Sequence, residues 1–239
     1  MMSMPAPIDG VPAGLEYLAM IDTITVHQIG GFETKNKYVL KNANGEQVYY
    51  AFEESERVER QCCGPGRGFT MHVLDNFKRE VLVVRRPFKC CGEACFGLCA
   101  NVQCCSSECT VQSPSGAVIG TVMQRSEYCS RIYEIKGVDD NFSLRVKRPC
   151  ACPCLIDIEF PFHTASGENI GSITRKWGGW ARAVYNDADV FSVTFPLELD
   201  VRAKAVLLGA TFLIDFLDFE CPEGLYAIPE AVSKLLCIP

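Results

Sequence analysis

The acidic residues between Asp187 and Glu198 carry oxygen ligands of the kind that bind hard cations. Asp187, Asp189 and Glu198 occupy positions 1, 3 and 12 of a window as long as an EF-hand loop. Calcium takes about six to eight oxygen ligands, mostly carboxylates and carbonyls. The rest of the window does not fit the loop, because Ser192 stands where a glycine belongs and phenylalanines fill two further ligand positions. The segment therefore predicts either a weak calcium site or an ordinary acidic turn that leads into a strand.

A cluster of cysteines follows the basic residues Arg85 and Arg86. Its candidate sites for covalent lipid attachment are Cys90, Cys91, Cys95, Cys99, Cys104 and Cys105. Residues 1–30 show no secretory signal, so most of the 15 cysteines in the chain should be reduced. Reduced cysteines beside basic residues suit palmitoylation, and more than one acyl chain would anchor the protein stably to a membrane.

Two other interpretations of the cysteine cluster remain open. Zinc binding is disfavoured, because the chain has no CxxC pair and no histidine lies near the cluster. The second interpretation is that these cysteines are buried or unreactive thiols with no ligand.

The overall composition excludes several classes of function. The chain has 239 residues, a net charge of −6 and an isoelectric point near 5.2, so as a whole it is not built to hold nucleic acid. It has no P-loop and no glycine-rich dinucleotide motif, and its 3 histidines fall on different predicted strands without a nucleophile motif. We therefore expect no catalytic site and no ATP-driven activity.

Five segments of alternating apolar residues each fold back at a turn. They are residues 38–52, 69–84, 109–123, 131–146 and 156–173, with turns at Asn44–Gly45, Asp75–Asn76, Ser115–Gly116, Asp139–Asn141 and Ser166–Gly167. Such turn residues are typical of tight hairpins, and a period near two is typical of strands. Strands at Ile21–His27 and Phe191–Val201 bring the count to about twelve. The sequence predicts a mainly β fold, a closed antiparallel barrel, because closure removes exposed sheet edges.

A barrel of this size needs something to fill its interior. The predicted helix covers residues 203–220, and its part from Ala205 to Glu220 is apolar nearly all round, as a fully buried helix should be. Its central positions are Ala205, Gly209, Phe212, Asp215 and Phe216. Residues 205–220 span about 24 Å as a helix, whereas a bilayer core needs about 20 residues. A helix inside a barrel is thus favoured over a membrane span.

The predicted elements define the domain organisation. We expect residues 14–220 to form the barrel domain, with the helix at its centre. Residues 1–13, rich in proline and glycine, are expected to be a disordered tail, and residues 221–239 a C-terminal tail.

Several short motifs resemble those of the phospholipid scramblases, and they occur in order from about Gly14 to Glu220. The motifs are Gly14–Leu18, Gly31–Thr34, Asn36–Tyr38, Cys62–Pro65, Asp187–Asp189, Phe195–Leu197 and Phe212–Phe216. The resemblance implies the fold of the Tubby-like proteins, a barrel of about twelve strands around a C-terminal helix, which agrees with the strand count above.

The resemblance also implies a function and a set of residues. Members of the family are calcium-activated, move phospholipid in both directions between leaflets without ATP, and are held at the cytosolic face of the plasma membrane by palmitate. Some enter the nucleus and bind DNA or protein partners. The matching calcium positions are Asp187, Asp189, Phe191, Val193 and Glu198, and the matching nuclear-import segment contains Arg175 and Lys176. Two basic residues fall short of a polybasic signal, so a strand with a solvated charged face is the alternative for that segment.

Three features depart from the family pattern. A long Pro-rich N-terminal region is missing, so we expect no polyproline ligand for SH3 or WW domains. The link between His27 and Gly31 is short, which predicts a shortened or missing strand. The cysteine cluster is more spread out than in the family, which affects the choice of lipidation sites.

We therefore expect a calcium-activated, ATP-independent, bidirectional phospholipid scramblase of the plasma membrane, with a phospholipid membrane as its partner and homo-oligomers as a further expectation. The alternative is an acyl-anchored cytosolic or nuclear adaptor that binds proteins, DNA or anionic lipid without moving lipid itself. Weakly bound calcium and covalent palmitate are the expected cofactors, and zinc is not expected.

Overall fold

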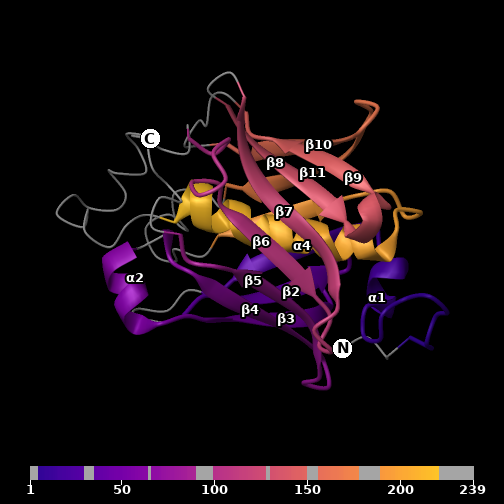
Figure 1. Ribbon diagram of the computed structural model, residues 1–239. Helices are drawn as coiled ribbons and strands as arrows, with labels where there is room; N and C mark the ends of the chain where they lie inside the picture. Colours follow the sequence, from indigo (N-terminus) through magenta and orange to yellow (C-terminus); the bar gives the residue numbers. More distant parts are fainter. Residues whose placement is uncertain are drawn as a thin grey trace.

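The computed structural model describes residues 5–29, 35–63, 66–89, 99–127, 130–149, 156–177 and 189–220. These residues form a closed antiparallel barrel of twelve strands, as the alternating pattern predicts (Figure 1). The strands are β1 Thr23–Gln28, β2 Lys37–Asn42, β3 Gln47–Glu54, β4 Phe69–Asp75, β5 Glu80–Arg86, β6 Glu108–Gln112, β7 Val118–Glu127, β8 Ser130–Gly137, β9 Ser143–Lys147, β10 Ile158–Thr164, β11 Asn169–Lys176 and β12 Val190–Thr194. The described helices are α1 Glu16–Ala19, α2 Arg57–Cys63, the 3₁₀ turn η3 Val138–Asp140, α4 Val201–Ile214 and the π-helical turn η4 Asp215–Phe219.

The strand order follows the sequence, so each strand pairs with its chain neighbours. The ring closes where β1 pairs with β12, with Thr23 opposite Thr194. All five predicted hairpins are present, and Gly45 adopts the positive φ of 78° that its turn requires. The short link after His27 removes no strand, because β1 and β2 both form and pair from Ile24 to Gln28.

Successive strands run in opposite directions, so all odd-numbered strands end at the same end of the barrel. We call this the α2 end, because α2 lies there, and the opposite one the α1 end (Figure 1). The connections from each odd strand to the next even strand therefore all lie at the α2 end.

One predicted strand is shorter than expected. The prediction of a strand from Phe191 to Val201 is wrong in its second half, because β12 ends at Thr194. Pro196 has no N–H to give to a ladder, and Asp200 caps the following helix by accepting a hydrogen bond from the Arg202 N–H at 2.6 Å. The helix accordingly begins at Val201, two residues before the predicted start.

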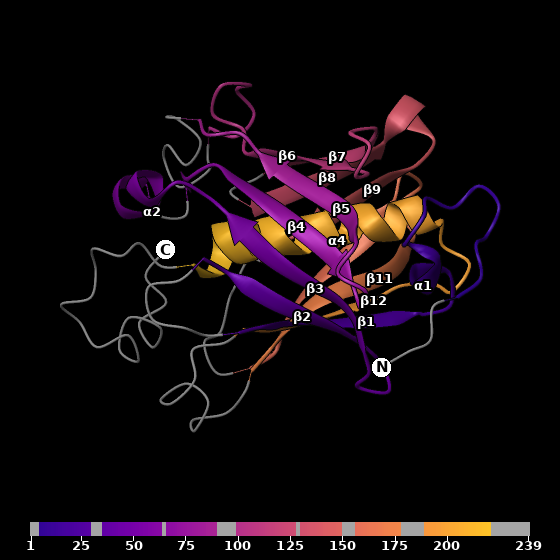
Figure 2. The same ribbon diagram turned by 90° about the horizontal axis from the view of Figure 1, so that it is seen from below.

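The predicted helix lies inside the barrel, surrounded by strands (Figures 1 and 2). Every residue from Ala203 to Phe216 is buried, as expected for a helix that is apolar nearly all round. Gly209 permits a close approach to β6, since a Cβ atom there would come within 2.5 Å of Val111 Cγ2. Among the described residues, no helix has both the length and the apolar character of a membrane span.

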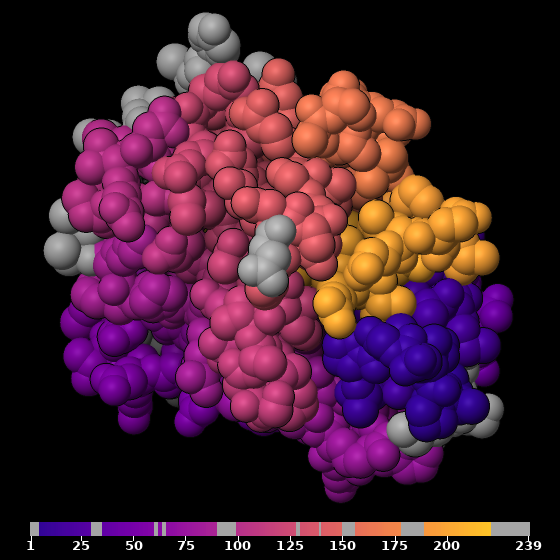
Figure 3. Space-filling view, turned by 45° about the vertical axis from the view of Figure 1, so that its right-hand side comes forward, coloured from indigo at the N-terminus to yellow at the C-terminus, as the bar shows by residue number. Residues whose placement is uncertain are grey.

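A buried lysine ties the start of α4 to the α1 end. The Lys204 side chain is 0% exposed, and its ammonium group donates to the carbonyl oxygens of Leu18 and Ile21 at 2.9 Å and of Leu197 at 2.8 Å. It also lies 4.8 Å from the ring centroid of Phe195. Burial lowers the pKa of Lys204. Figure 3 shows the result at the surface, where the indigo N-terminal segment lies against the yellow segment near the start of α4.

We predict that Lys204→Met lowers the free energy of unfolding by about 3 kcal/mol, because two buried carbonyls and a partly buried one lose a charged donor, at roughly 1–3 kcal/mol for each buried unsatisfied group. Urea denaturation measures the change. Lys176→Met is the matched control, because Lys176 is exposed and pairs with Asp157 on the surface, where an ion pair contributes about 1 kcal/mol or less. Equal losses for the two variants would contradict the assigned role of Lys204.

Candidate functional site

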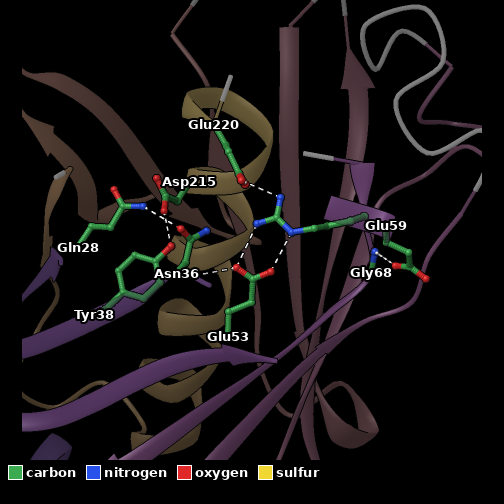
Figure 4. A network of polar contacts seen from close by, with 9 residues as sticks. Gln28, Asn36, Tyr38, Glu53, Glu59, Gly68, Asp215 and Glu220 are labelled. Carbon is green, nitrogen blue, oxygen red and sulfur yellow. Dashed lines mark hydrogen bonds and ion pairs between the residues drawn. The ribbon is translucent and has the colours of Figure 1, made fainter. Parts of the chain in front are cut away.

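Polar and charged side chains gather where the central helix ends. The helix passes into the π-helical turn η4 at the α2 end, a rare geometry that often accompanies functional sites. The turn directs Asp215 and Asp218 into the barrel mouth, where both carboxylates meet partners from the strands. Figure 4 shows Asp215, Glu220 and Glu53 converging there from the helix and from β3.

Asp215 is a buried carboxyl group of this cluster, at 4% exposure. Its Oδ2 accepts a hydrogen bond of 2.5 Å from the Tyr38 hydroxyl on β2. Burial raises the pKa of Asp215 well above its ordinary value, and the negative charge of Asp189 raises it further. The side chain is therefore protonated under conditions in which an exposed aspartate is charged.

Arg67 joins β3 to the end of the helix. Its guanidinium donates to Glu53 at 2.8 and 3.0 Å and to Glu220 at 2.7 Å, and it lies 4.5 Å from the ring centroid of Phe216. Burial acts to raise the pKa of Glu53, but the hydrogen bonds and charge of Arg67 outweigh it and lower that pKa. The ion pair is thus fully charged although Arg67 and Glu53 are almost completely enclosed.

Asp218 makes a second arginine cluster with β8 and β9. Its Oδ1 lies 2.8 Å from Arg131 Nη1 and 2.9 Å from Arg148 Nε, and its Oδ2 accepts a 2.5 Å hydrogen bond from Tyr133. With Arg67, these contacts tie the last helical turn to the surrounding sheet on two sides.

The predicted calcium residues do not lie together. Asp189 precedes β12 at the α2 end, whereas Glu198 is exposed in the turn after β12 at the α1 end. The five residues of β12 span about 16 Å at roughly 3.3 Å per residue, so one ion cannot bind both carboxylates. Phe191 and Val193 are 0% exposed with side chains in the barrel core. Asp187 lies outside the described residues.

Asp189 meets the predicted nuclear-import segment instead. Its Oδ1 accepts hydrogen bonds from Arg175 Nε at 3.0 Å and Nη2 at 2.7 Å. The same guanidinium lies 4.5 Å from the ring centroid of Phe219 at the end of η4. Lys176 pairs with Asp157 at 2.8 Å on the surface. Within the described part of the chain, no three His, Cys, Asp or Glu side chains form a group that would hold a metal ion.

The cysteines divide into accessible and enclosed ones. Cys104 is exposed, Cys99 and Cys105 are half-buried, and Cys90, Cys91 and Cys95 lie outside the described residues. Cys109, in contrast, is buried against the helix, and burial raises the pKa of its thiol to about 12. Cys62 on α2, which belongs to the Cys62–Pro65 motif, is a further exposed thiol at the same end.

Comparison with known proteins identifies the family. Residues 2–221 match the family model described as Scramblase. Phospholipid scramblase 1 of Rattus norvegicus is 42% identical over 92% of this chain and 66% of its own length. Phospholipid scramblase 2 of Bos taurus is 40% identical over 92% and 77%, and phospholipid scramblase family member 5 of Homo sapiens is 35% identical over 92% and 83%. The chain belongs to the scramblase family.

The resemblance seen in the sequence motifs is thus confirmed. This scramblase-family chain spans about two thirds of the length of its rat relative. No solved structure matches it, and the expected likeness to Tubby-like proteins stays a prediction.

Most of the charged network that holds the end of the central helix could not be predicted from the sequence. A usable signal existed in the strand pattern, because Tyr49, Ala51 and Glu53 alternate on the inward face of β3. A charge at the inward position of a strand end predicts a buried partner. Nothing in the sequence pointed to Arg67 or Arg131 as that kind of partner.

We predict that Asp215→Asn becomes more stable relative to the unmodified protein as the pH rises. The folded state holds the Asp215 proton more tightly than the unfolded state, so the unmodified protein loses stability as pH rises above about 4, by up to about 1.4 kcal/mol per pH unit. Asn accepts the same hydrogen bond from Tyr38 and does not titrate. Urea denaturation between pH 4 and pH 8 measures the difference.

The control for this experiment is Asp157→Asn. The hydrogen bond from Lys176 lowers the pKa of Asp157, so the stability that this carboxylate contributes is nearly complete at pH 4, and the difference between this variant and the unmodified protein should stay almost constant from pH 4 to pH 8. A stability difference between Asp215→Asn and the unmodified protein that stays constant with pH would show that Asp215 is charged.

Proposed function

We propose that this protein is an ATP-independent, bidirectional phospholipid scramblase that responds to calcium. The observation that carries the proposal is the match of residues 2–221 to the Scramblase family, with relatives named phospholipid scramblases at 35–42% identity. Scrambling runs down a concentration difference, so it needs no energy source, and this agrees with a sequence that has no nucleotide-binding motif.

We infer that the α2 end faces the membrane, at the cytosolic side of the plasma membrane. Among the described residues, large apolar side chains are exposed in equal number at both ends, with Ile29, Val58, Phe88, Val102, Ile156 and Trp177 at the α2 end, so the orientation rests on the cysteines. The exposed thiols of Cys62 and Cys104 lie at the same end. The cysteine cluster connects β5 to β6 there, so acyl chains on it would reach the same membrane surface.

Calcium binding is proposed at Asp189 together with Asp187, with lipid phosphate oxygens completing the coordination. An ion at Asp189 would compete with Arg175 for the same carboxylate. Arg175 also stacks on Phe219 at the end of the helix. Release of Arg175 from Asp189 would therefore weaken one of the contacts that hold the last helical turn inside the barrel. Arg175 thus connects the proposed calcium ion to the central helix.

The purified protein, reconstituted in vesicles with dye-labelled lipid, is expected to accelerate dithionite bleaching of the inner leaflet when calcium is added. Asp187→Ala should raise the calcium concentration for half-maximal effect about tenfold or more, because a carboxylate ligand is lost. Glu198→Gln is the matched control and should respond as the unmodified protein does, since Glu198 lies at the other end of β12. A response abolished by Glu198→Gln alone would move the calcium site to the α1 end.

Acylation of the cluster is tested by hydroxylamine-dependent acyl exchange on protein from eukaryotic cells. A variant with six cysteines replaced by serine should lose most of the label and shift from membranes to the soluble fraction, because anchoring needs more than one acyl chain. The six positions are Cys90, Cys91, Cys95, Cys99, Cys104 and Cys105. Cys109→Ser, at a buried position, should leave labelling unchanged. Undiminished label in the six-serine variant would place the acyl groups elsewhere, with Cys62 the first position to replace.

A second candidate function is favoured by one observation, the enclosure of α4 by the sheet. An acyl-anchored adaptor would bind proteins, DNA or anionic lipid with the barrel intact and would not move lipid. Protease protection of residues 221–239 in sealed cells discriminates between a helix that crosses the bilayer and one that stays in the barrel.

A further inference from the structure

The basic residues beside the cysteine cluster have different environments. Arg86 is 4% exposed and donates to Ser107 Oγ at 3.2 Å. Lys89 pairs with Glu108 at 3.0 Å. Arg85 is exposed on the outer face of β5, and no ion pair joins it to another residue in the part of the chain that the structure describes. Arg85 is thus the residue of this basic run that is available to a ligand.

Two threonines flank Arg85 on the outer face of the barrel. Arg85 lies opposite Thr70 on β4 and opposite Thr110 on β6. Directly opposite residues of antiparallel strands share a face, with Cβ atoms about 5 Å apart. A guanidinium between two hydroxyl groups forms a row of hydrogen-bond donors, which suits the oxygens of a phosphate group.

This row lies in a groove of about 470 Å³ at the α2 end. Carboxylates of Glu54, Glu56 and Glu59 and the ring of Phe88 also line the groove. Glu59 on α2 accepts a 3.1 Å hydrogen bond from the Gly68 N–H, which holds α2 beside the start of β4 (Figure 4). The groove therefore combines the exposed guanidinium of Arg85, three carboxylates and an aromatic ring that is 46% exposed, while a second arginine of its lining, Arg86, is buried and donates to Ser107.

The charges of the groove select its ligand. A purely anionic ligand would meet three carboxylates and only one exposed guanidinium, so free phosphate or a nucleic acid backbone is disfavoured. A zwitterion with a phosphodiester and an ammonium group matches both signs. A primary ammonium can donate hydrogen bonds to carboxylates, whereas a quaternary one is recognised by a cage of aromatic rings, and Phe88 is the exposed ring in this groove.

We propose that this groove binds the phosphoethanolamine headgroup of a phospholipid. The phosphodiester contacts Arg85, Thr70 and Thr110, the ammonium group contacts Glu56, and Phe88 lies toward the apolar part of the lipid. The proposal rests on the proposed function and adds a headgroup preference to it. Serine headgroups are disfavoured, because their extra carboxylate would face the glutamates.

The test uses the full-length protein and the water-soluble probe glycerophosphoethanolamine, with binding measured by calorimetry. Arg85→Gln is expected to weaken binding about tenfold through loss of a charge-assisted hydrogen bond. Glu56→Gln should weaken binding of this probe and leave binding of glycerol 3-phosphate unchanged or stronger. Arg202→Gln is the matched control, since Arg202 is an exposed arginine at the α1 end. Urea denaturation of each variant checks that the fold is intact.

Several results would overturn the headgroup site. They are equal affinity for inorganic phosphate, equal affinity for glycerophosphocholine, and equal losses in Arg85→Gln and Arg202→Gln. The vesicle assay separates this proposal from the proposed function. Scrambling by a protein that does not bind the probe would overturn the headgroup site and leave the proposed function standing. Binding of the probe without scrambling in any lipid mixture would overturn the proposed function and leave the headgroup site standing.

Discussion

The structure depends on the burial of one apolar helix inside a wide barrel. Twelve strands enclose a space that their own inward side chains do not fill, and α4 supplies the missing volume from Ala203 to Phe216. Neither part is stable alone, because an all-apolar helix needs cover and an unfilled barrel would leave its lining without contacts. Gly209 shows how little free space is left, because a Cβ atom added there would come within 2.5 Å of Val111 Cγ2.

A buried helix has backbone and side-chain polar groups at each end that need hydrogen-bond partners. The protein supplies these partners with different side chains at the two ends. At the α1 end, one lysine of the helix itself reaches three carbonyl groups of the loops. At the α2 end, the carboxylates of the last turn meet arginines from the wall. The helix is therefore held by hydrogen bonds and charges at its ends and by packing in between. The proposed calcium site contacts this system through Arg175 and Phe219.

The sequence predicted the fold better than the site, for a physical reason. Hairpins are local, so alternation around Asn44–Gly45 was enough to place β2 and β3, and the uniform apolar character of residues 205–214 indicated enclosure. Pairs such as Arg67 with Glu220 or Tyr38 with Asp215 join residues more than a hundred positions apart, and no periodicity encodes them. Asp189 and Glu198, two members of the expected calcium set, lie at opposite ends of β12, a separation that their spacing in the sequence did not reveal.

Ring closure between β1 and β12 has a consequence for synthesis of the protein. The first strand receives its second neighbour only when the last one has left the ribosome, and the helix that fills the interior follows later still. During translation the nascent chain therefore carries two unpaired sheet edges and an uncovered apolar lining. A chaperone that shields such surfaces would act on this chain until residues 190–219 emerge, after which folding removes both edges at once.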